Sequence, residues 1–305
     1  MESGVQSQFP FFEVELPTTI EQGFETLRRR LEITGLQESV ISTRQQGIRE
    51  SVSATMMVLD SFLIGSYRRN TMIAPLQEAD VDIVILLAEP HFQAGPIGVL
   101  DLVRNVLKRS FPTTRDISKD GQAVTIEFSD FHVDVVPAFP WEQGSILIPD
   151  STRNKWIMTN PKKHIEIWSY ANRIHGGMLI PLTKMLKCWN REKGMPLRSF
   201  HLETLTLNVL CNIPVLDFPS SIRYVFEKTL SNIPVFSQDP SGVSGNVGDY
   251  LDTIPKIGEA VISLQNARDI AIEAERFGNI GFISQAYDKW RILFGRYFPS
   301  YGLLS

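Results

Sequence analysis

The stretch GSYRRNTMIAPLQEADVDIVILL, residues 65–87, decides the fold, because it joins a Gly-Ser pair to an Asp-x-Asp motif on an apolar strand. Side chains alternate along an extended strand, so Asp80 and Asp82 point to the same face and can contribute to one site. The run from Val81 to Leu87 is rich in β-branched residues and is typical of a buried strand. The segment therefore predicts a strand inside a sheet, with two acids on one of its faces.

A third aspartate lies in FHVDVV, residues 131–136, which predicts a neighbouring strand that carries Asp134. Buried carboxylates this close raise each other's pKa unless a cation compensates them. Mg²⁺ and Mn²⁺ prefer such oxygen ligands, and two ions together can activate a hydroxyl and stabilise a leaving pyrophosphate. Asp80, Asp82 and Asp134 are therefore the candidate catalytic and metal-binding residues of a nucleotidyl transfer. A single Asp-x-Asp more often marks a strand end, so this interpretation depends on the motifs around it.

The Gly-Ser pair interrupts an apolar strand and is followed by polar and basic residues. Gly65 permits close approach of the backbone to a phosphate, and Ser66 offers a hydroxyl and a backbone N–H. If a helical turn starts there, its unpaired amides favour an anion, which predicts binding of the β- and γ-phosphates of a nucleotide. Arg68 and Arg69 could clamp phosphates. Exposed arginines in a polar loop are more often solvated, and we expect that of at least one of the two.

Together, the Gly-Ser pair, the Asp-x-Asp strand and the later strand with Asp134 resemble the polymerase-β nucleotidyltransferase superfamily. From about residue 36 onward the chain is similar to the branch of 2′-5′ oligoadenylate synthetases, cyclic GMP-AMP synthase and bacterial CD-NTases, or SMODS nucleotidyltransferases. The resemblance implies a bilobed α+β fold with a mixed β-sheet catalytic lobe, a long spine helix and a C-terminal helical lobe. We expect residues 1–155 to form the spine helix and catalytic lobe, and residues 156–305 to form the helical lobe.

Two later segments, LKCWN at residues 186–190 and RSFHLE at residues 198–203, resemble the helical-lobe segments that hold the donor nucleotide in this family. The resemblance implies that Lys187 and Ser199 contact phosphates. It also makes Phe200 a candidate for stacking on a base, although an aromatic residue on an amphipathic helix more often belongs to the core. With Gly65, Ser66 and Arg68, these three residues complete the predicted nucleotide-binding set.

Periodicity along the rest of the chain predicts the remaining elements. A proline-free stripe over residues 36–59, including Met56 and Leu59, predicts the long helix ahead of the Gly-Ser strand. Leu102 is expected to face inward on a helix at residues 96–111. Further helices are expected at residues 162–173, 179–191, 199–211, 220–231, 254–277 and 280–298, and strands at residues 122–128 and 131–137.

Composition restricts the class of partner and the compartment. With 30 basic and 34 acidic residues and a pI near 5.8, the chain lacks the positive field that long nucleic acids require, so small nucleotides fit better. Its two cysteines, Cys188 and Cys211, indicate neither a disulfide framework nor the zinc insertion of animal cyclic GMP-AMP synthase. No apolar run approaches the roughly 20 residues that span a bilayer, and the N-terminus does not resemble a secretion signal. We therefore expect a cytoplasmic protein without membrane partners.

The resemblance implies an enzyme that condenses NTPs, ATP among them, into a cyclic di- or oligonucleotide second messenger. Asp80 and Asp82 would hold both Mg²⁺ ions, which Mn²⁺ can replace, and Asp134 would complete the hydroxyl-activating site. In relatives such a product binds a separate effector protein in bacterial antiphage (CBASS) signalling. Two alternatives stay open: a terminal nucleotidyltransferase acting on RNA, a small molecule or a protein, and a catalytically silent nucleotide-binding module.

Overall fold

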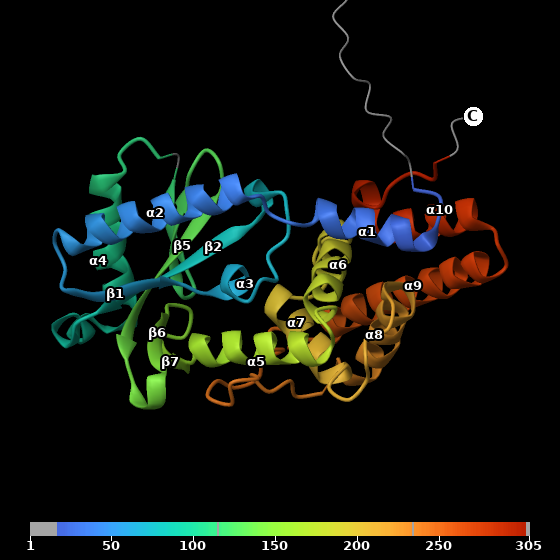
Figure 1. Cartoon of the computed structure of the whole chain (residues 1–305). Helices are drawn as coiled ribbons and strands as arrows, with labels where there is room; N and C mark the ends of the chain where they lie inside the picture. The colour runs from blue at the N-terminus through green and yellow to red at the C-terminus, as the bar shows by residue number, and fades with distance from the viewer. Residues whose placement is uncertain (1–16, 115, 234, 303–305) are drawn as a thin grey trace, which may run out of the picture.

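A mixed sheet with the acidic strand β2 next to its centre organises the first half of the chain (Figure 1). The structure is a computed structural model that describes residues 17–114, 116–233 and 235–302. In this part of the chain the sheet order is β1-β2-β5-β4-β3, and β6 joins β5 to β7. The strands are β1 (Val58–Leu63), β2 (Asp80–Leu87), β3 (Ile117–Asp120), β4 (Ala123–Glu127), β5 (His132–Pro140), β6 (Ile146–Asp150) and β7 (Lys155–Thr159).

Alternation along β2 divides the sheet into an apolar face and a functional face. Val81, Ile83 and Ile85 are fully buried against the helices α2 (Gly35–Ser53) and α4 (Gly95–Ser110). Full burial of a side chain of this size contributes about 1.5 to 3 kcal/mol of transfer free energy, so the register of β2 is strongly specified. A shift by one residue would turn Asp80 and Asp82 into the apolar core.

The second lobe is helical and has its own core. Its helices are α1 (Ile20–Arg30), α6 (Leu179–Glu192), α7 (Ser199–Val209), α8 (Phe218–Asn232), α9 (Ile254–Asn279) and α10 (Ile283–Phe294). Helix α5 (Pro161–Ile174) runs from the sheet to this lobe (Figure 1). The α+β class and the two-lobed architecture expected from the sequence are thereby confirmed.

Helix α1 belongs to the helical core although it precedes the sheet in the chain. The ring centroid of Phe24 lies 4.9 Å from that of Trp290 and 5.1 Å from that of Phe298. Strand β7 spans residues on both sides of the expected boundary between residues 155 and 156, and it pairs with β6. The division into two domains stays a prediction, and these contacts place α1 on the helical side of it. Residues 1–16 lie outside the described part of the chain.

Two expectations for the helices beside the sheet are wrong in detail. The helix begins at Gly35, after Thr34 caps it, but it ends at Ser53 rather than near residue 59. Leu59 lies on β1 and is exposed, because the chain turns before the strand and the helical stripe does not continue. On α4, Leu102 is exposed and Leu100 takes the inward position. Both errors arise because hydrophobic periodicity indicates neither where a helix ends nor which side of it packs against the sheet.

Among the described residues, no helix combines the length and the apolar character needed to cross a membrane.

The other predicted helices are confirmed within a few residues at their ends, except that α10 begins at Ile283 instead of residue 280 and ends at Phe294. The short helix α3 (Gly65–Arg68) begins at the Gly-Ser pair, as the helical-turn interpretation of that motif requires.

Candidate functional site

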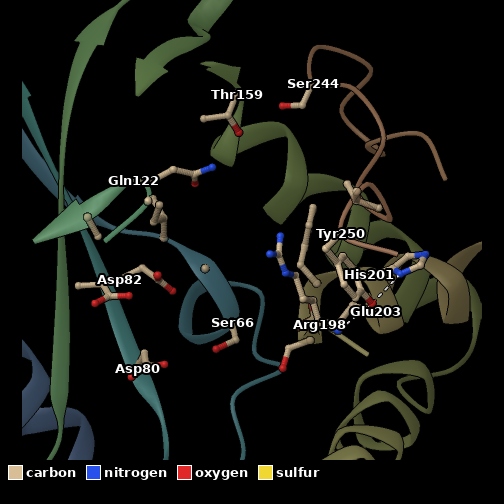
Figure 2. Close-up of a pocket in the computed structure, with 18 of the residues that line it drawn as sticks. Ser66, Asp80, Asp82, Gln122, Thr159, Arg198, His201, Glu203, Ser244 and Tyr250 are labelled. Carbon is tan, nitrogen blue, oxygen red and sulfur yellow. Dashed lines mark hydrogen bonds between the residues drawn. The ribbon is translucent and has the colours of Figure 1, made fainter. Parts of the chain in front are cut away.

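The three aspartates lie on one face of two adjacent parallel strands. In the register of β2 with β5, Asp82 is directly beside Asp134, and Asp80 is beside His132. Thr125 on β4 donates a hydrogen bond of 2.6 Å to Asp134 Oδ1, which fixes that carboxylate. Asp80 is more open, because its side chain is 63% exposed and its Oδ1 lies 3.6 Å from His132 Nδ1. Figure 2 shows Asp80 and Asp82 along the same strand, facing one pocket.

The carboxylate of Asp82 is the electrostatically unusual member of this group. Burial, and after it the charge of Asp134, raise the pKa of Asp82 to about 7. Asp82 is half-buried, and the charges of Arg69 and Lys187 lower its pKa by less than burial and Asp134 raise it. A pair of carboxylates in such an environment fits a divalent cation. Within the described ranges there is no preformed cluster of three or more His, Cys, Asp or Glu side chains arranged to hold a metal. The fit therefore depends on Asp82 and Asp134, with Asp80 at the open side.

The position of the Asp82 carboxylate leaves no room for a side chain at Gly65. Its φ is +63°, and a Cβ placed on it would lie 1.8 Å from Asp82 Oδ2. The sequence suggested that this glycine allows a phosphate to approach the backbone; in the structure, the group that approaches it is the carboxylate. The backbone N–H of Ile64 also donates to Asp82 O, at 3.0 Å, so the turn is attached to β2.

Of the two arginines after Ser66, the structure brings the second one to the cavity. Arg68, which was the predicted binding residue, is exposed and is absent from the cavity wall. Arg69 is 8% exposed and forms a two-pronged ion pair with Glu203, with its Nε 2.9 Å from Oε2. Because α3 has a single turn, adjacent residues point in different directions, and the sequence alone did not separate them.

Opposite the acids, a buried ionic network forms the helical wall. Glu203 on α7 accepts hydrogen bonds from Arg69, from Thr71 Oγ1 at 2.9 Å and from Lys187 Nζ at 3.2 Å. Lys187 Nζ also donates to Thr71 O at 2.9 Å. The predicted phosphate contact Lys187 therefore lines the cavity, but it is also a member of a network that links the two lobes.

The charges of this network stabilise one another. Burial alone would raise the pKa of Glu203, but the charges of Arg69 and Lys187 outweigh that effect and lower it to about 2. At Lys187, burial lowers the pKa, and the charge of Glu203 opposes that shift. Glu203 was not among the predicted site residues, because its partner Arg69 is 134 residues away in the sequence.

The predicted residues Ser199 and Phe200 both line the cavity, at the start of α7. Ser199 is the first residue of the helix, where backbone N–H groups have no intrahelical partner. The ring of Phe200 packs 5.8 Å from that of Trp168, and the Arg69 guanidinium lies 4.8 Å from its centroid. Phe200 is therefore partly a packing residue, and one side of it stays at the cavity.

Between the two walls lies a cavity of about 1250 Å³. This volume is large enough for more than one small ligand, since single ligand pockets typically measure about 300 to 1,000 Å³. Figure 2 shows acids on the sheet side and Arg198, His201 and Tyr250 on the helical side. Sequence reasoning did not select the wall residues Gln122, Thr159, Arg198, His201, Ser244 and Tyr250.

A loop before α9 closes one side of this cavity. Asp239 in the loop accepts a 2.6 Å hydrogen bond from His164 Nε2 on α5. Burial alone would raise the pKa of Asp239, but hydrogen bonds from His164 and Ser241 lower it to about 2. Ser244 Oγ donates to Met158 O at 2.7 Å, which attaches the loop to β7 as well. The loop is thereby held as part of the cavity wall.

Comparisons with known proteins agree with this geometry. The model of the Second Messenger Oligonucleotide or Dinucleotide Synthetase domain matches residues 18–172. Among curated relatives, a cyclic AMP-AMP-AMP synthase of Acinetobacter sp. (strain ATCC 27244 / 9458) is 28% identical over 78% of this chain and 72% of its own length. A cyclic AMP-AMP-GMP synthase of Enterobacter hormaechei is 23% identical, over 68% of each chain.

The fold is also that of a solved enzyme. The structure of Vibrio cholerae DncV cyclic AMP-GMP synthase with a linear intermediate superposes with a TM-score of 0.76, at 15% identity, over 94% of this chain and 98% of that chain. The matched residues 18–172 make up half of the 305 residues and contain all three aspartates and the Gly-Ser pair. The resemblance stated from the motifs is confirmed, and so is the enzyme class. The chain belongs to the Second Messenger Oligonucleotide or Dinucleotide Synthetase family of nucleotidyltransferases.

Proposed function

We propose that this enzyme condenses NTPs, with ATP among them, into a cyclic di- or oligonucleotide. The observation that carries the proposal is the pair Asp82 and Asp134, side by side on parallel strands, facing a cavity whose opposite wall is basic. The names of the two curated relatives, which contain AMP, support ATP as one substrate. The cavity volume of about 1250 Å³ supports two nucleotides bound at once.

In this proposal, Asp80, Asp82 and Asp134 hold two Mg²⁺ ions, which Mn²⁺ can replace. When bound, the ions neutralise the acids, lower the pKa of the attacking hydroxyl and stabilise the pyrophosphate that leaves. Gly65 keeps the Asp82 carboxylate in place, and Thr125 does the same for Asp134. Ser66 offers its hydroxyl and backbone N–H to the phosphates of one nucleotide.

On the helical wall, Lys187 and Ser199 contact the phosphates, and Phe200 offers its free side to a base. Lys187 Nζ donates to Glu203 at 3.2 Å, and that carboxylate favours the charged ammonium, which would balance part of the polyphosphate charge from within the network. Arg68 has no role here, since it is exposed and does not line the cavity. Water is displaced from the cavity as nucleotides fill it, which strengthens these ionic contacts.

The product is proposed to act in the cytoplasm as a second messenger in bacterial antiphage (CBASS) signalling, through a separate effector protein. Membership of a second-messenger synthetase family supports this role. A long nucleic acid is not a proposed partner, because the sequence carries 34 acidic against 30 basic residues.

Incubation of the chain with labelled NTPs and Mg²⁺ or Mn²⁺, followed by phosphatase, tests the activity. A cyclic product has no terminal phosphate and resists the phosphatase, and mass spectrometry then gives its size. We expect a protected product that disappears in Asp80→Asn/Asp82→Asn. Product formed equally well without those carboxylates would refute the proposed chemistry.

The same experiment separates the two alternatives. A terminal nucleotidyltransferase would extend an added RNA or label a small molecule or a protein, and its product from NTPs alone would stay sensitive to phosphatase. A catalytically silent module would bind nucleotides and give neither product.

A further inference from the structure

Arg198 has a charge that the protein itself does not balance. In the part of the chain that the structure describes, its guanidinium makes no ion pair and no hydrogen bond. The other arginines of the cavity wall each pair with a carboxylate: Arg69 with Glu203 at 2.9 Å, Arg153 with Asp249 at 2.8 Å and Arg191 with Glu78 at 3.3 Å. Arg198 is thus the arginine of this wall whose donors stay available to a ligand.

Tyr250 fixes the place of Arg198 from two directions. The guanidinium carbon lies 4.6 Å from the centroid of the Tyr250 ring, which is within the range of a cation–π contact. The Tyr250 hydroxyl accepts a 2.9 Å hydrogen bond from the backbone N–H of Arg198. The same hydroxyl lies 3.0 Å from Nδ1 of the buried His201. Such fixing reduces the side-chain entropy that Arg198 loses when it binds.

The surroundings of Arg198 favour an anion. It is the residue that precedes α7, an 11-residue helix whose N-terminus has no side-chain cap. The unpaired amides and the dipole of the helix add positive potential at Ser199, next to the guanidinium. Figure 2 shows the Arg198 side chain extending into the cavity on the side that faces Asp80 and Asp82.

We propose that Arg198 binds the triphosphate of the donor nucleotide from the helical wall, and that Tyr250 is its positioning residue. This inference rests on the proposed function and deepens it, because it adds a specific ligand for the polyphosphate. Guanidinium groups match phosphate oxygens in a two-pronged geometry, which makes arginine suited to this task. The contact selects for the number of phosphates and is indifferent to the base.

The test compares two ligands on three variants of the full chain. Calorimetry measures the affinity for α,β-methylene-ATP, which is not hydrolysed, and for AMP. Arg198→Ala should weaken binding of the triphosphate about tenfold or more, because it removes charge-assisted hydrogen bonds, and should change binding of AMP less than about twofold. Arg198→Lys should recover part of the loss. Arg173→Ala is the matched control, since Arg173 is exposed, lies 5.7 Å from the Tyr170 ring and is not on the cavity wall.

Kinetics test Tyr250 separately. Tyr250→Phe keeps the ring and loses the hydroxyl, so we expect KM for NTP to rise by a few fold while kcat stays close to that of the wild type. Tyr250→Leu, which also loses the ring, should raise KM further. Equal triphosphate affinity in Arg198→Ala and wild type, or an equal loss for AMP and triphosphate, would overturn the inference. Absence of product from the wild-type enzyme would instead overturn the proposed function.

Discussion

Asp82, which is half-buried, and Glu203, which is fully buried, line one cavity, and their surroundings shift their pKa values in opposite directions. Asp82 on the sheet faces Asp134, and its pKa is raised to about 7. Glu203 on the helical wall accepts hydrogen bonds from Arg69, Lys187 and Thr71, and its pKa is lowered to about 2. Glu203 is balanced within the chain, whereas at Asp82 the charges of Arg69 and Lys187 offset only part of the effect of burial and of Asp134.

This difference separates a structural charge from a functional one. A buried carboxylate with two cations and a hydroxyl around it holds elements together, and its removal should damage the fold. A buried carboxylate next to another acid costs stability, and such a cost is expected where a site awaits a cation. The two walls of the cavity therefore predict different results for the same kind of substitution.

Asp82→Asn should have the largest effect, and on activity. Loss of a metal ligand removes several kcal/mol of transition-state stabilisation, so we expect product formation to fall about 10³-fold. The free energy of unfolding should not fall, because the substitution removes a charge that partial burial and the neighbouring Asp134 disfavour. The labelled-NTP assay and urea denaturation measure the two quantities. Asp60→Asn, which removes an exposed acid outside the cavity wall, is the control.

Glu203→Gln should have the reverse profile. It leaves Arg69 and Lys187 as buried cations without a counter-charge, so we expect the free energy of unfolding to fall by about 3 kcal/mol. Urea denaturation at neutral pH gives the value, and Glu227→Gln on the surface is the matched control. A stability equal to that of the wild type would show that Glu203 is not the structural partner that the comparison requires.

The difference in stability between wild type and Glu203→Gln should depend on pH. The folded-state pKa of Glu203 is lowered from 4.5 to about 2, so its stabilising effect is fully present above pH 4.5 and is lost as the pH falls toward 2. We therefore expect a constant difference at neutral pH and a shrinking one in acid. A difference that grows on acidification would contradict the assignment of the charges.

Gly65→Ala should have a smaller effect, at the junction of the Gly-Ser turn with Asp82. The new Cβ would fall 1.8 Å from Asp82 Oδ2 at a φ of +63°, so the turn and the carboxylate must separate. We expect the free energy of unfolding to fall by about 2 kcal/mol. Product formation should fall by the factor that about the same free energy corresponds to, because the Asp82 carboxylate is displaced. Gly47→Ala, on α2 with no atom within 4 Å of its Cβ, should be neutral or slightly stabilising. Equal behaviour of the two variants would show that the glycine is not needed by Asp82.

The sheet side of the site could be predicted from the sequence because its determinants are local. Two acids at alternate positions of an apolar strand share a face in any sheet, and Asp134 sits on a second strand of the same kind. The pairing of Asp82 with Asp134 needs only that these strands be neighbours. Ser66 at the start of a helical turn follows in the same way from the Gly-Ser pair.

The helical side could not be predicted to the same depth because its determinants are distant in sequence. Glu203 reads as one more acid on a helix until Arg69 and Lys187 are placed around it. Arg198 belongs to the RSFHLE segment, but only the three-dimensional placement shows that its charge is unpaired and that its guanidinium lies over the Tyr250 ring. The predicted residue Arg68 does not line the cavity, whereas its neighbour Arg69 does. Which of the two faces the cavity depends on the orientation of one helical turn, which the sequence does not indicate.

Titration of Mn²⁺ followed by electron paramagnetic resonance, in the presence of α,β-methylene-ATP, tests most directly whether the sheet acids are a cation site. Mn²⁺ bound to the analogue alone is subtracted with a protein-free sample. The account predicts saturable binding to the wild type and to Glu227→Gln, and a loss of that binding in Asp82→Asn/Asp134→Asn although the variant stays folded. Undiminished Mn²⁺ binding in the folded double variant would contradict it.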